Sequence, residues 1–221
     1  MTLNSRCTVL IVVLGALMVG LGTAEAQNRA QRWEVAFGGL YQLGIDLDSE
    51  VGSTFESDNE LGFVIDFAYN VDDHLAVDFE FAYAGVGYDA SVVTEEDGLV
   101  GISGKMDEMI LSANAIYHFS PGPVTPYIGA GIGYTWIDTN VPTGPPQGVC
   151  WWDPWWGWVC YETYPTDTRD AFSYQALLGL RYEFNPMSFM KLSYTSQWMD
   201  FSGPDSTPRF DIIGLELGWM F

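Results

Sequence analysis

The sequence predicts an all-β protein, folded as an eight-stranded antiparallel up-and-down barrel that crosses a membrane. Three observations predict this fold. About eight segments alternate apolar residues with polar or small ones at the period of a β-strand. The connections between these segments are alternately long and short. Beyond one N-terminal run, no stretch is apolar enough for a transmembrane helix, and a chain that crosses lipid with strands must close them into a barrel.

The first three segments have the cleanest alternation and cover Trp33–Leu43, Leu61–Asn70 and Leu75–Tyr83. In the second of them, one face carries Leu61, Phe63, Ile65, Phe67 and Tyr69. The opposite face carries Gly62, Val64, Asp66 and Ala68. Since successive side chains of a strand point to opposite sides, we expect the apolar face to meet lipid and the other face to line a lumen.

The five later segments alternate less regularly. Their outward residues run from Met109 to Phe119, Ile128 to Trp136, Phe172 to Phe184, Met190 to Trp198 and Phe210 to Phe221. The inner face of the fifth segment carries Tyr127, Gly129, Gly131, Gly133 and Thr135. Small residues of this kind suit a narrow lumen. Each segment has about the 9 to 11 residues with which a tilted strand crosses a bilayer.

The connections predict which end of the barrel faces which compartment. The long, mostly acidic connections are Gly44–Glu60, Ala84–Lys105, Asp138–Arg169 and Met199–Arg209. The tight ones are Asn70–His74, Ser120–Thr125 and Asn185–Met187. Short turns on the periplasmic side and long extracellular loops are typical of such barrels. Aromatic residues near the strand ends are expected to form the interfacial girdles: Trp33, Tyr69, Tyr83, Tyr117, Phe119, Tyr182 and Phe184.

The N-terminus has the features of an export signal. Arg6 precedes an apolar run from Val9 to Gly22, which is followed by Ala24-Glu25-Ala26, a small-residue cleavage pattern. The run is shorter than the roughly 20 residues of a membrane span, although a retained anchor is the alternative. We therefore expect residues 1–26 to be a cleaved signal peptide and residues 27–221 to form the barrel domain.

The charge and composition exclude several classes of protein. The formal net charge is −21, and the expected cleavage leaves it unchanged because Arg6 and Glu25 leave together. Such a chain is a poor ligand for nucleic acid, whose phosphates need Lys and Arg, and for anionic lipid head groups. With 15% aromatic residues and 24 glycines, it is also too rich in strand-forming residues for a disordered acidic chain.

The pattern of the last strand and the alternation of long and short connections together resemble those of a known family. The strand alternates Ile213, Leu215, Leu217, Trp219 and Phe221 with small or polar residues, and an earlier strand reads YIGAGIGY from Tyr127. In these features residues 33–221 are similar to the small eight-stranded bacterial outer-membrane barrels of the OmpA, OmpX and opacity-protein type, here without a peptidoglycan-binding domain. The alternative is a soluble β-sandwich, which also alternates.

The resemblance implies a location and several partners. It implies that the chain resides in the bacterial outer membrane as a monomer, surrounded by outer-membrane lipid and lipopolysaccharide. It also implies that the outer-membrane assembly machinery recognises the terminal strand through Leu217, Trp219 and Phe221.

Ionisable residues fall on the inner faces of the strands. The acidic ones are Glu34, Asp66, Asp78, Glu80, Glu183 and Glu216, and the basic ones are Arg181 and Lys191, with His118 beside them. An eight-stranded barrel is only just wide enough for its own side chains, so enclosed charges must pair or lose their charge. We therefore expect a salt-bridge plug near the periplasmic mouth, in which Arg181 and Lys191 hold Glu34, Glu80 and Glu216.

The third long connection contains five tryptophans between two cysteines, Cys150 and Cys160. The tryptophans are Trp151, Trp152, Trp155, Trp156 and Trp158. Two cysteines in an exported chain predict a disulfide rather than a metal site. The tryptophans have two interpretations. They form a recognition platform for a glycan, a lipopolysaccharide or a host surface, or they pack on one another and rest at the membrane interface.

Two further kinds of site are suggested by the residues. Acidic clusters in the first two long connections suggest Ca²⁺ or Mg²⁺ binding, but they lack the spacing of an EF-hand and suit solvated charge better. His118-Phe119-Ser120 resembles the His-x-Ser pair of lipid A deacylase barrels but falls at a periplasmic turn, so we expect no enzyme, cofactor or metal. The sequence thus predicts a structural or narrow-pore, porin-like barrel, with a surface-binding protein as the alternative and a lipid-modifying enzyme last.

Overall fold

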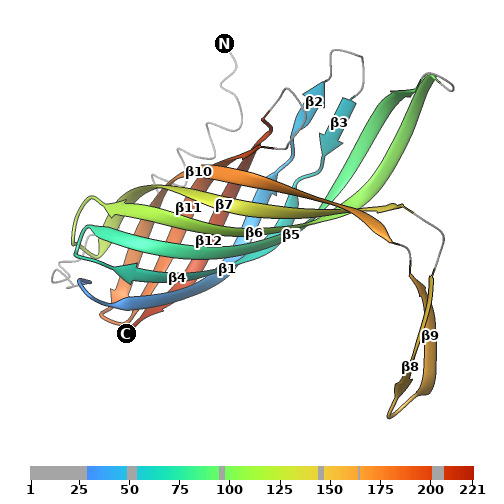
Figure 1. Cartoon of the computed structure of the whole chain (residues 1–221). Helices are drawn as coiled ribbons and strands as arrows, with labels where there is room; N and C mark the ends of the chain where they lie inside the picture. Colours follow the sequence, from blue (N-terminus) through green and yellow to red (C-terminus); the bar gives the residue numbers. More distant parts are fainter. Residues whose placement is uncertain (1–28, 49–53, 95–97, 144–146, 164, 201–206) are drawn as a thin grey trace.

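The computed structural model describes residues 29–48, 54–94, 98–143, 147–163, 165–200 and 207–221, and within these ranges eight strands close into an antiparallel barrel (Figure 1). In chain order they are β1 (Trp33–Leu43), β4 (Glu60–Asn70), β5 (Leu75–Thr94), β6 (Gly98–His118), β7 (Val124–Pro142), β10 (Thr166–Asn185), β11 (Ser188–Asp200) and β12 (Arg209–Met220). Among the described residues, no helix has the length and apolar character needed to cross a membrane.

The barrel closes where the first strand meets the last. β1 pairs with β12 in antiparallel register, with Glu34 opposite Met220, and on its other side β1 pairs with β4. Beyond the last ladder pair, the Trp33 amide donates to the Phe221 carbonyl (3.0 Å) and the Phe221 amide donates to the Trp33 carbonyl (2.9 Å). β5 pairs with β6 on the far side, so the ring has no open edge at this level. The predicted fold class is therefore confirmed.

The two faces of the wall follow the predicted alternation. Outward residues such as Phe37, Phe79 and Leu178 are exposed, whereas their chain neighbours Ala36 and Asp78 are buried in the lumen. An apolar outside around a partly polar inside is the reverse of a soluble sandwich, whose apolar faces are hidden between sheets. The wall therefore has the surface of a barrel that is surrounded by lipid.

One end of the barrel, here called the turn end, has only tight connections. The Asp72 carboxylate accepts hydrogen bonds from the amides of His74 (2.7 Å) and Leu75 (2.8 Å), and these bonds hold the pKa of Asp72 below its ordinary value. The Asn185 side chain caps another turn by accepting from the amides of Met187 and Ser188. Both are local Asx bonds that explain why Asp and Asn occupy these turns.

At the opposite end, the loop end, the strands are longer than the sequence predicts. We expected the third strand to end at Tyr83 and 84–105 to be a loop, but β5 and β6 continue as a paired ladder up to Thr94 opposite Gly98. Beyond Tyr83, glycines at 85 and 87 interrupt the outward apolar pattern, while Val86 stays buried inside. The alternating sequence pattern indicates only the part of a strand that contacts lipid. Backbone pairing can continue beyond that part, because it does not require apolar outward side chains.

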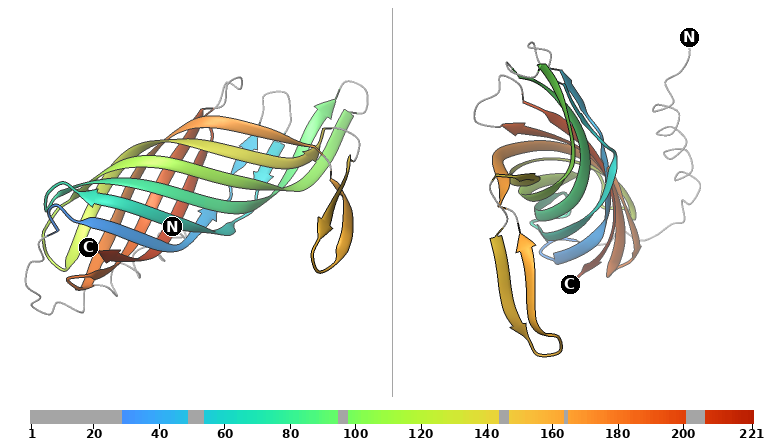
Figure 2. Two further views of the ribbon diagram at one scale, coloured as in Figure 1. Left: turned by 60° about the horizontal axis from the view of Figure 1, so that its bottom comes forward. Right: turned by 90° about the vertical axis from the view of Figure 1, so that its right-hand side faces the viewer.

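Two small hairpins lie at the loop end. β2 (Asp46–Asp48) and β3 (Thr54–Ser57) extend the wall, because β3 pairs with β5. β8 (Gln147–Asp153) and β9 (Gly157–Thr163) form a separate two-stranded sheet. Figures 1 and 2 show this second hairpin beyond the loop end, extending to one side of the barrel rather than over its mouth.

Candidate functional site

Arg181 is the centre of a charge network in the lumen near the turn end. It lies on β10 and is almost completely buried, and its guanidinium donates two hydrogen bonds to Glu34 on β1 (2.7 and 2.8 Å). Its Nε donates to Glu183 on the same strand (2.9 Å), and its Cζ lies 3.7 Å from the ring centroid of Phe189. Since β11 and β12 separate β10 from β1, the bidentate pair crosses the lumen.

Lys191 on β11 forms a second group beside the first. Its ammonium contacts Asp66 on β4, lies 2.9 Å from Glu216 on β12, and lies 3.7 Å from Asp78 on β5. All four side chains are buried. β5 lies half-way around the ring from β11, so this group also joins opposite walls. Both groups include residues that the sequence placed in the lumen.

Two of the expected lumen residues lie elsewhere in the arrangement. Glu80 forms no ion pair within the described ranges, and instead accepts a hydrogen bond from the Ser112 hydroxyl (3.4 Å). Glu80 lies two residues farther from the turn than Asp78, above the level of Lys191. The expected ion pair of Glu80 with Arg181 or Lys191 is therefore not formed, and Lys191 pairs with Asp66 and Asp78 instead. His118 is buried and its ring packs against the ring of Tyr127.

Arg29 is a member of the network that sequence reasoning missed. It precedes β1 and is fully buried, with its Nε 3.1 Å from Glu183. Its Nη2 donates to the Ser120 carbonyl (2.7 Å) and to the Thr125 hydroxyl (3.1 Å). The lumen charges expected from the sequence all lie within alternating segments, and Arg29 lies outside them. The sequence feature that could have indicated Arg29 is its position as a basic residue three positions after the expected cleavage site.

Above the charges, the lumen is filled by two further layers. The lower one is a polar belt in which Gln175 donates to Asn114 (2.8 Å) and Gln197 donates to Thr135 (3.2 Å). The upper one is apolar and contains Leu40, Val64, Ala82, Ala84, Val86, Tyr88, Met106, Ile110, Ile137, Ala171, Met199 and Phe210. One buried polar pair, Gln42 with Glu108 (2.9 Å), lies on the strands of this layer. The sequence did not single out Glu108, which directly precedes the expected fourth strand.

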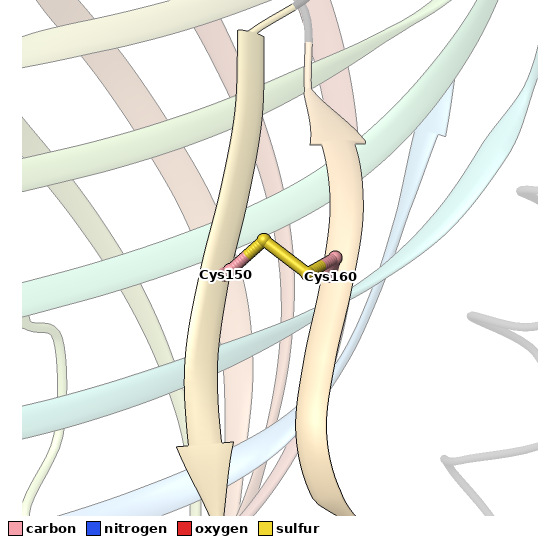
Figure 3. Close-up of a disulfide and its surroundings, with 2 residues drawn as sticks. All are labelled: Cys150 and Cys160. Carbon is pink, nitrogen blue, oxygen red and sulfur yellow. A yellow bond between two sulfur atoms is a disulfide. The ribbon is translucent and has the colours of Figure 1, made fainter.

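The tryptophan-rich segment is the β8–β9 hairpin. Cys150 and Cys160 face each other across its two strands and form a disulfide, as predicted (Figure 3). Asp153 fixes the tip by accepting hydrogen bonds from the amides of Trp155 (2.8 Å) and Trp156 (2.9 Å). The Trp152 and Trp158 rings meet edge to face, and every one of the five tryptophans is exposed. The hairpin thus presents rings instead of burying them.

The remaining suggested sites are not assembled by the structure. Within the described part of the chain, no three His, Cys, Asp or Glu side chains are arranged to hold a metal ion. Glu50 and the acidic residues 95–97 lie outside the described residues, as does the expected signal peptide. His118 ends β6 and points into the lumen, while the Ser120 carbonyl accepts from Arg29.

A family model described as outer membrane protein beta-barrel domain matches residues 14–221. The chain belongs to this family. The membership confirms the predicted location in the bacterial outer membrane and identifies the apolar outside of the wall as its lipid-facing surface. Phe221, Trp219 and Leu217, expected to serve as the assembly signal, lie on this surface. No curated protein matches the sequence.

Solved outer-membrane barrels have the same fold. Neisserial surface protein A matches with a TM-score of 0.57 and 14% identity over 86% of this chain and 97% of that one. OprG of Pseudomonas aeruginosa matches with a TM-score of 0.56 and 14% identity over 89% and 98%. Ail of Yersinia pestis, solved with the heparin analogue sucrose octasulfate, matches with a TM-score of 0.50 and 16% identity over 87% and 99%.

Proposed function

We propose that this outer-membrane barrel is a structural protein whose lumen is closed to ions and solutes. The observation that carries the proposal is the pairing of charges across the lumen. Arg181 joins β10 to β1, and Lys191 joins β11 to both β4 and β5. An eight-stranded barrel leaves little room beyond its own side chains, so these pairs occupy the path that a solute would take.

The layers above the charges oppose ions by a different physical effect. An ion that entered from the loop end would meet the mostly apolar layer around Val86 and Met106, which also holds the Gln42–Glu108 pair, before it reached the ion pairs of Arg181 and Lys191. Apolar constrictions resist wetting and exclude ions. The charge network near the turn end excludes them instead by filling the lumen with ion pairs. Both barriers must open together for current to flow, which favours a closed barrel over the narrow pore that the sequence also allows.

The orientation and the assembly of the barrel follow as parts of the same proposal. We place the turn end in the periplasm and the loop end outside the cell, because short periplasmic turns are the rule in such barrels. Residues 1–26 would direct export and be removed, which would bring Arg29 close to the new N-terminus. The terminal strand would be read by the assembly machinery, and the barrel would work as a monomer without a cofactor or catalytic group.

Swelling of proteoliposomes in a small sugar tests the closed lumen. We expect no swelling above that of empty liposomes for the wild type. Arg181→Ala combined with Met106→Ala and Met199→Ala should swell, because this variant leaves a gap both in the charged layer and in the apolar layer above it. Arg209→Ala is the matched control, since the Arg209–Asp211 pair is largely exposed at the loop end. Swelling by the wild type at the rate of an open porin would refute the proposal.

A second function, binding at the cell surface, is favoured by one specific observation. The tryptophan hairpin holds five large rings exposed at the loop end, and exposed apolar patches of this kind mark binding sites. Ail was solved with a sulfated ligand, but a net charge of −21 on the present chain opposes a polyanion. We therefore infer an uncharged or zwitterionic ligand. Loss of surface binding on changing the hairpin tryptophans to Gln is the test.

A further inference from the structure

The rings at the tip of the β8–β9 hairpin are more exposed than those on the lipid-facing wall. Trp155 and Trp156 are 85% and 82% exposed, against 43% for Trp33 and 44% for Trp219 on the barrel. Trp152 and Trp158 oppose each other in the ladder and share one face, with the disulfide pair two positions behind them on that same face. Four rings thus gather at the tip and on one face of the hairpin.

The hairpin is built to keep these rings in place. The disulfide joins the two strands, the Asp153 carboxylate fixes the tip, and Gly157 takes a positive φ of 76° that a tight turn requires. A stapled hairpin of this kind does not collapse around its own rings. It therefore loses little conformational entropy when its tip binds an apolar partner.

The chemistry of the hairpin favours a lipid interface over a sugar. Between the two cysteines, the only polar side chain apart from the indole N–H groups is that of Asp153, and one of its oxygens already accepts two backbone amides. A sugar site needs several placed hydrogen-bonding groups beside its rings. An indole ring has an apolar body and one polar N–H, which suits the boundary between head groups and acyl chains.

The charge and position of the hairpin restrict the class of ligand further. From Gln147 to Thr163 the hairpin carries Asp153 and Glu162 but no Lys or Arg, so it has no group that would attract an anionic phosphate. In both figures it lies beyond the loop end and extends to one side of the barrel, and it continues from β7 and β10, whose outward faces carry Tyr134, Trp136 and Tyr174 at this end. The aromatic surface of the hairpin is thus continuous in the chain with the lipid-facing surface.

We infer that the tryptophan hairpin inserts its tip into the outer leaflet of the membrane that surrounds the barrel, at the uncharged boundary between head groups and acyl chains. This inference rests on the proposed surface-binding function and names its ligand as lipid. The inserted tip anchors the loop end to the bilayer. It does not depend on whether the lumen conducts.

Quenching of tryptophan fluorescence in the full-length protein tests this inference. The protein is placed in liposomes of phosphatidylcholine with or without bromine on the acyl chains. The emission of a Trp155→Gln, Trp156→Gln double variant is subtracted from that of the wild type, which isolates the tip. We expect brominated lipid to reduce this difference emission by about twofold or more, and aqueous iodide to affect it little.

Two controls keep the test decisive. Trp136→Gln gives a difference spectrum from the lipid-facing wall and shows how strongly a lipid-contacting ring is quenched. If the glutamines disturb assembly, a Trp155→Phe, Trp156→Phe pair isolates the same emission with apolar rings retained. Quenching of the tip by iodide and not by brominated lipid would overturn the inference. A neutral oligosaccharide that shifts the tip emission, without lipid quenching, would overturn it too while leaving surface binding in place.

Discussion

Replacing Arg181 with Met should destabilise the barrel strongly. Met has a similar volume and still packs on Phe189, so the variant removes the charge and its hydrogen bonds without opening a large cavity. Two buried carboxylates, Glu34 and Glu183, lose a partner. Breaking a buried pair by removing one member costs about 3 to 5 kcal/mol. We expect the lower end, because Arg29 still faces Glu183 and the Asn70 amide still donates to Glu34.

The matched test is a double-mutant cycle in urea, with the barrel folded in lipid vesicles. Glu34→Gln combined with Arg181→Met removes both charges of the bidentate pair. The double variant should be more stable than Arg181→Met alone, and the coupling free energy should be about 2 kcal/mol. An Arg181→Met variant within about 0.5 kcal/mol of the wild type, or purely additive effects, would refute the assigned role of the cross-lumen pair.

Three further predictions follow from single residues. Gly218→Val should lower the free energy of unfolding by about 1 to 3 kcal/mol, because a side chain there meets the buried Phe189 ring, and urea unfolding measures it. Cys150→Ser should leave the unfolding midpoint of the barrel unchanged but make the hairpin sensitive to protease, since the hairpin is a separate sheet. Asp72→Ala should destabilise the barrel at about pH 7 and destabilise it less at about pH 2. The lowered pKa of Asp72 means that its contribution is complete above the ordinary Asp value and is lost as the pH falls through the lowered one. A shifted midpoint for Cys150→Ser, or an Asp72→Ala effect that is the same at both pH values, would contradict these expectations.

The lipid-crossing part of the fold was predictable because lipid imposes a strict pattern. Alternation such as that of Leu61 to Asn70 fixes both the strand and its inward face, and the closed ring follows because open edges are costly in lipid. The tight turns were equally readable, since Asp72 and Asn185 bond to the backbone two or three residues ahead. The disulfide required only the compartment and the presence of two cysteines.

The parts that were missed lie where that pattern does not apply. The continuation of β5 and β6 beyond the expected lipid boundary depends on backbone pairing alone, and no apolar outward face marks it. Arg29 precedes the first strand, and its burial follows from the closed shape of the turn end. The partners of Lys191 depend on which carboxylates lie at its height in the lumen. The sequence shows that Asp78 and Glu80 both point inward, but it does not show which of the two is level with Lys191.

Single-channel recording in planar bilayers tests the closed lumen most directly. Purified wild-type protein, inserted and held under voltage, should give no open-channel steps, because the ion pairs of Arg181 and Lys191 and the apolar layer above them block the same path. A steady, ohmic current from the wild-type barrel would contradict the account.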